Sequence, residues 1–430
     1  RRPFVVYWSK FPAPWFVDRC NAVAARGTVE LEVWFDVRHP DKWDWDVDES
    51  DWQFRARYVP TRRLAGWANR LPLPELRERA PDLFVSDYDN GHLAFGFAAA
   101  RATAGRTAFR VLPTFDAWSE RTWWRELGKH VVFRAVDGAK VGGLDGARLA
   151  GRYGLPVDRT WDVTQSIDLA RYSAAATTGP EERAAARRAL GLSGVVLIYV
   201  GRLWDGKGVS HLLDAYTELR RSGRDVSLLL VGNGPDEDRY QARAREVPGV
   251  AFTGWQQRDR TPWYYSLADV LVFPTLGDPN GLVVTEALAA GLPVVSSDAA
   301  GNIHRRLPTG GPGLVVPAGD VPALTEALRT LADDGDLRRS MAARAPAHVQ
   351  GMGADSYAAD FDRFVAGVLA APRRRTPAAA AVRALGRVVA GGRASRGDPA
   401  PYVDRVAAAA AGGRSEDAGP GPARGREERP

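Results

Sequence analysis

The feature that most restricts the fold of this 430-residue chain is a regular alternation of short apolar runs with longer helical stretches. The first run, "FVVYW" at Phe4–Trp8, is expected to be a buried strand, and "FVDRCNAVAAR" after it a helix that ends at Gly27. Further strands are expected at "VELEVWF", "PDLFVSD" and "TAFRVLPTF", with a helix at "TWWRELGKHVVFRAV". Because strands that alternate with helices pair in parallel beneath those helices, the pattern predicts α/β layers.

The same alternation starts again after a linker of small residues near Ser173. Strands are expected at "VVLIYVG", "VSLLLVG", "GVAFTGW", "ADVLVFPT", "PVVSSD" and "GLVVP", with helices between most of them. We therefore predict an α/β fold with two Rossmann-like domains, at residues 1–172 and 173–352, and a cleft between them. Ligands of such sheets bind beyond the carboxyl ends of the strands, which places the expected site in this cleft.

Length and composition agree with two domains, because 430 residues of which 45% are apolar are more than one domain with a single hydrophobic core usually contains. Cys20 is the only cysteine, which excludes an internal disulfide. We interpret it as a core thiol, since no histidine lies near it in the sequence. No run of 18 apolar residues and no signal peptide is recognised, so we expect no membrane-spanning helix and a cytoplasmic location.

Positive charge is concentrated at the end of the chain. Residues 371–430 contain 12 Arg and 6 acidic residues, which accounts for the whole net charge of +6. The rest of the chain is balanced and has no zinc-ligand spacing or basic helix, so we expect no nucleic-acid partner. Ala, Gly, Pro and Arg dominate residues 373–430, which we predict to be disordered. Contact of this basic tail with the inner face of a membrane remains open, as does an amphipathic helix at "AAAAVRALGRVVA" lying on that membrane.

The turn after the first strand of the second series has the composition of a phosphate site. "YVGRLWDGKGVSHLLDAY" leaves a strand, turns through three glycines and enters a helix, with Arg202 and Lys207 beside the turn. Glycines let the backbone approach a ligand, helix N-termini attract anions, and two cations neutralise a diphosphate. Lys207 is one of only five lysines in the chain. Taken alone, however, the pair is explained slightly better as two solvated cations at a strand–helix turn.

A second turn makes a ligand site the better interpretation of these residues. "LGDPNGLVVTEA" also follows a strand and enters a helix, where Gly281 and Leu282 would present free amides. Glu286, one turn into the helix, could bind a ribose diol, and Asp278 a sugar hydroxyl. Each acid alone is better explained as a capping or solvated residue. With Arg202 and Lys207 at the same edge of one sheet, we expect the group to converge on a sugar diphosphate.

These motifs resemble a known family. "YVGRLWDGKG", "LLLVGNGP", "VAFTGW", "ADVLVFPT", "GDPNGLVVTEALAAGLPVV" and "GLVVPAGD" occur in the order and spacing typical of retaining GT-B glycosyltransferases of the glycosyl transferases group 1 family, family 4. The resemblance is specific over Val195–Asp334. In the first half it is limited to the order of elements and to "TWDVTQSIDLARY".

The resemblance implies roles for individual residues. Arg202 and Lys207 match the basic pair on the donor diphosphate, and Glu286 matches the second acid of the Glu-x7-Glu motif, which holds the ribose. Asp278 matches the first acid, near the donor sugar, but is one methylene shorter than Glu. The remaining expected substrate contacts are the Gly281, Leu282 and Val283 amides at phosphate or sugar, Gly254 and Trp255 at the base, and Asp116 at sugar or acceptor.

The resemblance also implies a reaction. A nucleotide-diphosphate sugar is the donor, no cofactor or metal takes part, and the sugar passes to an acceptor hydroxyl of a saccharide, lipid or small metabolite. Transfer is on the same face, with the leaving phosphate helping to deprotonate the acceptor. The second domain holds the nucleotide and the first the acceptor, and a final helix at residues 353–372 crosses back to the first domain. Two departures are "WSKFPAPWF", which lacks the family's Gly pair, and Phe115–Asp116 where a His is common; Asp116 is also explained by a strand-end turn.

Three other interpretations are kept. Asp87 and Asp89, or Asp44, Asp46 and Asp48, would suit the divalent cation of an Asp-x-Asp glycosyltransferase. "LLLVGNGPDED" begins a dinucleotide fingerprint but has Glu237 where a third glycine belongs. A catalytically inactive relative that acts as a nucleotide-binding scaffold is the third.

Overall fold

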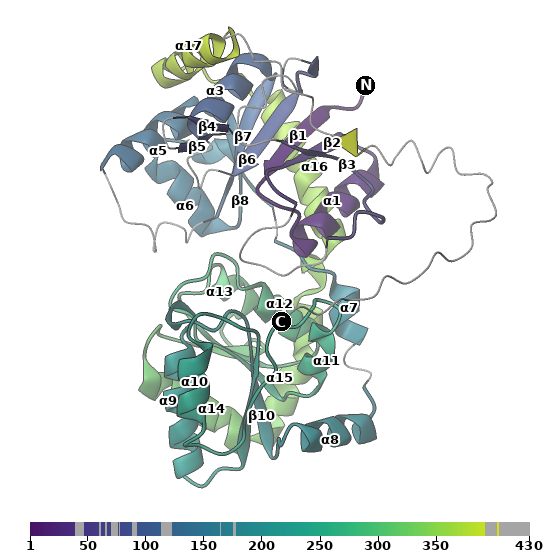
Figure 1. Cartoon of the computed structure of the whole chain (residues 1–430), viewed down its shortest axis with the longest axis vertical. Helices are drawn as coiled ribbons and strands as arrows, with labels where there is room; N and C mark the ends of the chain where they lie inside the picture. The colour runs from purple at the N-terminus through teal and green to yellow at the C-terminus, as the bar shows by residue number, and fades with distance from the viewer. Residues whose placement is uncertain are drawn as a thin grey trace, which may run out of the picture.

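The computed structural model describes residues 1–38, 47–59, 62–64, 67–69, 76, 78–87, 93–112, 123–163, 165–174, 178–391 and 402–403. Two α/β halves lie one above the other, each built around its own sheet (Figure 1). The predicted class, two Rossmann-like units with mainly parallel sheets, is confirmed.

The first half contains an eight-stranded sheet in the order β16-β3-β2-β1-β6-β7-β8-β9. All neighbours pair in parallel except β16 with β3. Its strands are β1 (Phe4–Ser9), β2 (Glu30–Phe35), β3 (Arg55–Tyr58), β6 (Leu83–Asp87), β7 (Arg106–Val111), β8 (Gly138–Val141), β9 (Thr160–Asp162) and β16 (Tyr402–Val403). A separate hairpin joins β4 (Arg62–Leu64) and β5 (Trp67–Asn69).

The helices of the first half are α1 (Pro14–Arg26), α3 (Leu93–Thr103), α5 (Trp123–Ala135) and α6 (Leu144–Arg152). The 3-10 turn η1 (Val157–Arg159) and α7 (Leu169–Ser173) lead out of it, and Tyr172 of α7 is already buried in the core of the second half. In α1, Pro14 opens the helix, Phe16, Cys20 and Val23 are buried, and Gly27 ends it with φ 63°. The burial of Cys20 agrees with its interpretation as a core thiol, and the same burial strongly raises the pKa of the thiol.

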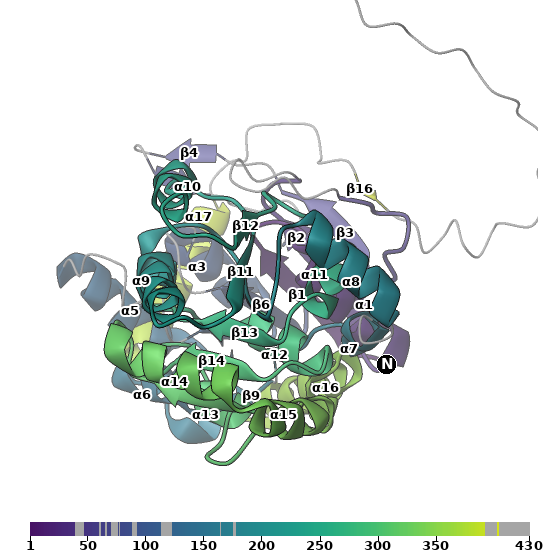
Figure 2. The same cartoon turned by 90° about the horizontal axis from the view of Figure 1, so that it is seen from below.

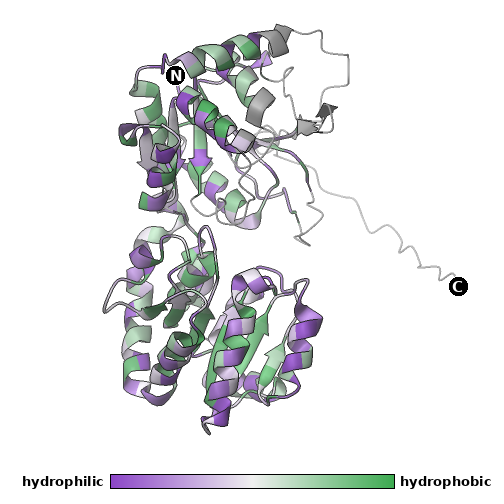
Figure 3. Ribbon diagram, turned by 90° about the vertical axis from the view of Figure 1, so that its left-hand side faces the viewer, coloured by the Kyte–Doolittle hydropathy of each residue, from purple (hydrophilic) through white to green (hydrophobic). Residues whose placement is uncertain are grey.

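The second half contains an all-parallel sheet in the order β12-β11-β10-β13-β14-β15. Its strands β12, β11, β13 and β14 are labelled in Figure 2. Its strands are β10 (Val195–Val200), β11 (Val226–Val231), β12 (Val250–Phe252), β13 (Val270–Phe273), β14 (Val294–Ser297) and β15 (Gly313–Val316). The order reverses between β10 and β13, and ligands of doubly wound sheets bind at such a switch point. The strands are strongly apolar between helices with hydrophilic outer faces (Figure 3).

The helices of the second half follow its strands in turn. They are α8 (Pro180–Ala189), η3 (Asp205–Lys207), α9 (Val209–Arg221), α10 (Glu237–Ala244), α11 (Thr261–Ser266), α12 (Leu282–Ala289), α13 (Ile303–Arg306), α14 (Val321–Asp333), α15 (Gly335–His348) and η4 (Gln350–Met352).

The chain then returns to the first half as α16 (Ala354–Ala370). Tyr357, Phe361 and Phe364 are buried in the core beneath β1 and α1, with the Phe361 ring stacked 6.3 Å from that of Tyr7. The outgoing and returning segments touch where they cross, because the Ile167 amide donates to the Met352 carbonyl at 3.3 Å. The two halves are therefore joined by two adjacent stretches of chain.

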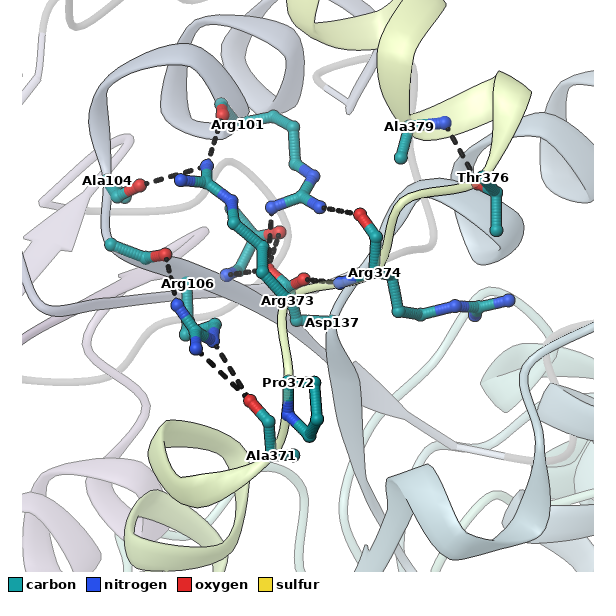
Figure 4. Close-up of polar contacts among 12 residues, drawn as sticks. Arg101, Ala104, Arg106, Asp137, Ala371, Pro372, Arg373, Arg374, Thr376 and Ala379 are labelled. Carbon is teal, nitrogen blue, oxygen red and sulfur yellow. Dashed lines mark hydrogen bonds and ion pairs between the residues drawn. The ribbon is translucent and has the colours of Figure 1, made fainter.

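The prediction of a disordered tail needs a correction at its start, because α17 (Pro377–Gly391) packs against α3 and α5. Before it, the chain is fastened to a buried Arg101–Asp137 ion pair of 2.6 Å (Figure 4). The Arg374 amide donates to Asp137 at 2.9 Å, and the Arg374 carbonyl accepts from Arg101 at 3.0 Å.

Small side chains explain why composition misled the prediction for this helix. A Cβ on Gly386 would lie 1.9 Å from the Ala98 carbonyl oxygen, so the backbones of α17 and α3 approach very closely. Close approach of this kind buries area without large side chains. Thus the stretch "AAAAVRALGRVVA" is helical, as the alternative of an amphipathic helix held. Its buried face, however, packs against α3 and α5 of the same chain. The rest of the predicted tail lies outside the described residues, apart from β16.

Candidate active site

The loops that follow β10 and β13 are packed directly on one another. Gly208 has φ 71°, and a Cβ there would lie 1.9 Å from the Pro274 carbonyl oxygen. The Leu276 amide donates to the Gly206 carbonyl at 3.1 Å. The predicted meeting of these two loops at the switch point is therefore what the backbone shows.

Lys207 and Asp278 meet at this contact. The Lys207 Nζ lies 2.6 Å from Asp278 Oδ2 and 3.4 Å from the Gly277 carbonyl oxygen. The two side chains are only 18% and 20% exposed, so the pair is partly shielded from solvent. An ammonium fixed at a half-buried loop contact can stabilise a nearby anion more strongly than a freely solvated one.

Asp278 also caps the turn before α12, which is the structural role that the sequence analysis gave as the alternative to sugar binding. Its Oδ1 accepts hydrogen bonds from the Asn280 amide at 2.8 Å and the Gly281 amide at 2.6 Å. One carboxylate therefore orders the start of α12 and holds Lys207. Because the Gly281 amide is used in this way, it does not point at a ligand as predicted.

The next amides of α12 differ from that of Gly281. Leu282 and Val283 are half-buried, and their backbone amides have no acceptor among the described residues. Gly281 adopts φ 51°, which turns the chain into the helix. Free first-turn amides at a strand-to-helix turn form an anion-binding position.

Arg202 begins the loop that ends at Lys207. Its carbonyl accepts a hydrogen bond from the buried Tyr199 hydroxyl at 2.8 Å, which anchors the backbone, and its side chain is exposed. The structure thus places Arg202 on the predicted loop.

Glu286 lies one turn into α12, in a half-buried setting that the sequence did not reveal. The Tyr265 hydroxyl donates to its Oε2 at 2.8 Å. Burial raises the pKa of Glu286, while the Tyr265 and Tyr172 hydroxyls and the Arg258 charge oppose that rise. The carboxylate is therefore neither a solvated helix residue nor a member of the Lys207–Asp278 pair.

Gly254 and Trp255 follow β12, beside the end of β11. The Gly232 amide donates to the Gly254 carbonyl at 3.0 Å, and Trp255 is half-buried. A Cβ on Gly234 would lie 2.1 Å from the Leu203 carbonyl oxygen. The two glycines that began a dinucleotide fingerprint are thus explained by close packing of loops.

The two halves also touch at several polar contacts near these loops. Arg258 forms an ion pair with Asp18 of α1. Arg305 of α13 lies 2.6 Å from Asp162 of β9. Beside the second contact is a small hollow, lined by Gly142, Gly143, Asp162, Gln165, Asn302, Arg305, Arg306 and Met352.

Several predicted residues cannot be placed. Asp116, Asp44, Asp46 and Asp89 lie outside the described residues. Asp87 is paired with Arg110 at 2.7 Å, and Asp48 accepts from the Ser50 amide at 2.8 Å. Within the described ranges, no three His, Cys, Asp or Glu side chains gather as a metal site, and no helix there is long and apolar enough to cross a bilayer.

Sequence reasoning missed the residues that surround the predicted acids. Tyr172, Tyr265 and Arg258 frame Glu286, and Asn302 follows the loop bonded to Asp278. Only "TPWYYS", an unusually aromatic short helix, could have drawn attention to Tyr265.

The second half of the chain, which carries this site, is similar in sequence to a known protein family. Residues 194–334 match the model of the family described as glycosyl transferases group 1. The chain is 32% identical over 288 residues to D-inositol 3-phosphate glycosyltransferase of Nocardia farcinica, which covers 61% of this chain and 62% of that protein. The chain thus spans less than two thirds of this relative's length.

A second relative is matched over more of its length. The GDP-mannose-dependent alpha-(1-6)-phosphatidylinositol monomannoside mannosyltransferase of Mycolicibacterium smegmatis is 31% identical over 289 residues, which is 61% of this chain and 72% of that protein. Among solved structures, Anabaena HepE in complex with UDP superposes with a TM-score of 0.69 at 17% identity, over 85% of this chain and 100% of that one. At that identity the likeness concerns the fold alone.

Proposed function

The chain belongs to the glycosyl transferases group 1 family, and from that premise we propose that it transfers a sugar from a nucleotide-diphosphate sugar to an acceptor hydroxyl. The observation that carries the proposal is the Lys207–Asp278 pair, held between two loops at the switch point of the second sheet. The likeness to an Anabaena protein solved with UDP and with UDP-glucose supports a nucleotide-sugar donor.

Breaking the bond between sugar and diphosphate leaves negative charge on the diphosphate. We propose that Lys207 and Arg202 neutralise this charge as it develops, together with the Leu282 and Val283 amides. Asp278 would then face the donor sugar while it keeps Lys207 aimed at the phosphates. In this assignment no metal is needed, because the side chains and amides supply the positive potential, and activity is expected to survive excess EDTA.

Glu286 is proposed to bind the ribose. A half-buried carboxylate that accepts from Tyr265 still has lone pairs for a diol, and its position one turn into α12 is near the amides assigned to phosphate. Gly254 and Trp255, at the neighbouring strand end, are proposed to lie at the base. The nucleotide is identified by thermal shift with UDP, GDP and ADP, since a ligand at 100 times its Kd stabilises a fold by about 2.7 kcal/mol.

Transfer with retention at the anomeric carbon is part of the proposal. The leaving phosphate oxygen would take the acceptor proton on the face from which it departs. We place the acceptor against the first half, where α1 approaches the second half through the Asp18–Arg258 ion pair. The basic tail at residues 373–430, in which 12 Arg outnumber 6 acidic residues, is proposed to contact anionic lipid.

Lys207→Ala provides the direct test. We expect kcat/KM to fall by about 10²–10³-fold, because one donor to a developing oxyanion is lost. The kcat/KM of Arg202→Ala is expected to fall as well. Arg224→Ala is the matched control, since Arg224 pairs with Asp333 at 2.7 Å away from these loops. Release of nucleotide and transfer to acceptor are measured together, and unchanged turnover in Lys207→Ala would refute the proposal.

A further inference from the structure

Asn302 lies in the loop that leads from β14 into α13, and its backbone is unusual. It is the only non-glycine residue of the described chain with a positive φ, at 57°. Asparagine tolerates this left-handed conformation better than most residues. The side chain is thereby turned away from its own half and toward the first half.

The receiving surface is the turn between β8 and α6. The Asn302 Nδ2 donates to the Gly142 carbonyl at 2.5 Å. Its Oδ1 lies 2.1 Å from the place where a Cβ on Gly143 would stand, so only glycine leaves room for the amide. Next to it, Asp162 accepts from the Gly143 amide at 2.9 Å and from Arg305 at 2.6 Å. The contact therefore fits one side chain into a shaped recess.

The other end of the same loop is fastened to the Asp278 turn. The Gly301 amide donates to the Asp278 carbonyl at 2.7 Å, and the Asp278 amide donates to Ala299 at 3.3 Å. A Cβ on Gly301 would lie 2.3 Å from the Pro279 carbonyl oxygen, so the two turns are in direct contact.

Arg306 links the Asn302 loop to α12 by hydrogen bonds. Its buried guanidinium donates to Thr285 Oγ1 of α12 at 3.0 Å and to the Gly301 carbonyl at 2.9 Å. The Asn302 loop, α12 and the Asp278 turn are thus tied together by hydrogen bonds within the second half.

We propose that Asn302 is a positioning residue, which sets the separation between the donor-side turn at Asp278 and the acceptor-side turn at Gly142–Gly143. The proposal rests on the proposed function, in which the half that carries the Asp278 turn binds the donor and the half that carries the Gly142–Gly143 turn binds the acceptor. Transfer needs the acceptor oxygen within contact distance of the donor carbon, whereas hydrolysis needs only water. An error in the separation therefore penalises transfer more than hydrolysis.

Two substitutions remove the contact while respecting the backbone. Asn302→Gly accepts the positive φ and lacks the amide; Asn302→Asp keeps the shape but cannot donate to the Gly142 carbonyl. We expect both to keep wild-type KM for the donor and its rate of hydrolysis, and to lower kcat for transfer by about tenfold or more. His304→Ala, on the exposed side of α13, is the matched control and is expected to match the wild type.

A distance measurement without substrate separates this inference from the proposed function. Because Cys20 is buried, labels can be attached at Arg148→Cys of α6 and Glu218→Cys of α9, both exposed. We expect a single narrow distance distribution in the parent and a broader one in Asn302→Gly. An unchanged distribution, or a transfer-to-hydrolysis ratio equal to that of the parent, would overturn the positioning role. A broadened distribution in a protein that transfers no sugar would instead refute the proposed function alone.

Discussion

At the scale of single residues, the site depends on charges that already have partners. Lys207 is neutralised by Asp278, whose carboxylate is also fixed by two backbone amides. A diphosphate entering this site would share the ammonium with Asp278, so the lysine is held in position without needing a ligand to order it. Glu286 differs, because its burial makes its charge sensitive to pH.

The raised pKa of Glu286 predicts opposite effects of pH on stability and on nucleotide binding. The fold favours the protonated carboxyl, so its contribution to stability is present below the unfolded pKa and is lost as pH rises through the folded pKa. Ribose binding needs the ionised form, so nucleotide affinity should fall as pH drops through that same raised pKa. Glu286→Gln should bind more weakly at neutral pH and lose this pH dependence. Calorimetric titration with nucleotide at a series of pH values from acid to neutral measures the affinity of the wild type and of Glu286→Gln. If affinity changed equally with pH in the two proteins, the ribose assignment would be contradicted.

At the scale of elements, three loops at the switch point are packed backbone to backbone. Glycines at the ends of β10 and β11 let the neighbouring loops approach at distances where a side chain would collide. Such contacts give the site its shape without contributing side-chain chemistry, and they transmit a disturbance in one loop to the next.

Gly208→Ala tests this packing. The new Cβ would lie 1.9 Å from the Pro274 carbonyl, at φ 71°. Gly223→Ala is the matched control, since Gly223 has φ 82° and no atom within 4 Å of its Cβ position. We expect the control to lose about 1 kcal/mol from the left-handed backbone alone, and Gly208→Ala to lose at least about 2 kcal/mol more together with nucleotide binding. Similar melting temperatures for the two would show that the loops have room to move.

The elements also show what the sequence could predict. The expected strands of both series form, and the loops carrying Lys207 and Asp278 meet, because strand ends at a switch point follow from element order. The partners of Glu286 and the Asn302 contact could not be predicted, since they join segments far apart in the chain. The helix α17 was missed because composition reports side-chain size, whereas its packing relies on backbone approach at Gly386.

At the scale of the whole molecule, the first half is completed by α16 and α17, which follow the second half in the chain. Both α16 and α17 contribute buried residues to it, and the segment between them satisfies the Arg101–Asp137 pair. Buried charges of this kind are destabilising when a partner is removed.

Truncation tests this arrangement. A chain ending at Pro372 loses the Arg374 amide on Asp137 and the carbonyl on Arg101, as well as α17. Each buried polar group left unsatisfied costs about 1–3 kcal/mol, so we expect a clearly lower melting temperature. A chain ending at Gly391 is the control: it keeps α17 and the Arg374 contacts, and it should melt like the full chain. Equal stability of the two truncations would contradict the role given to α17.

The return of α16 and α17 has a consequence for the order in which the protein can fold on the ribosome. The half that is translated first lacks two of its helices until α16 and α17 have emerged, by which time the whole of the second half has been synthesised. The nascent first half therefore lacks the Tyr357, Phe361 and Phe364 side chains of its core until then, so its final packing is expected to follow that of the second half.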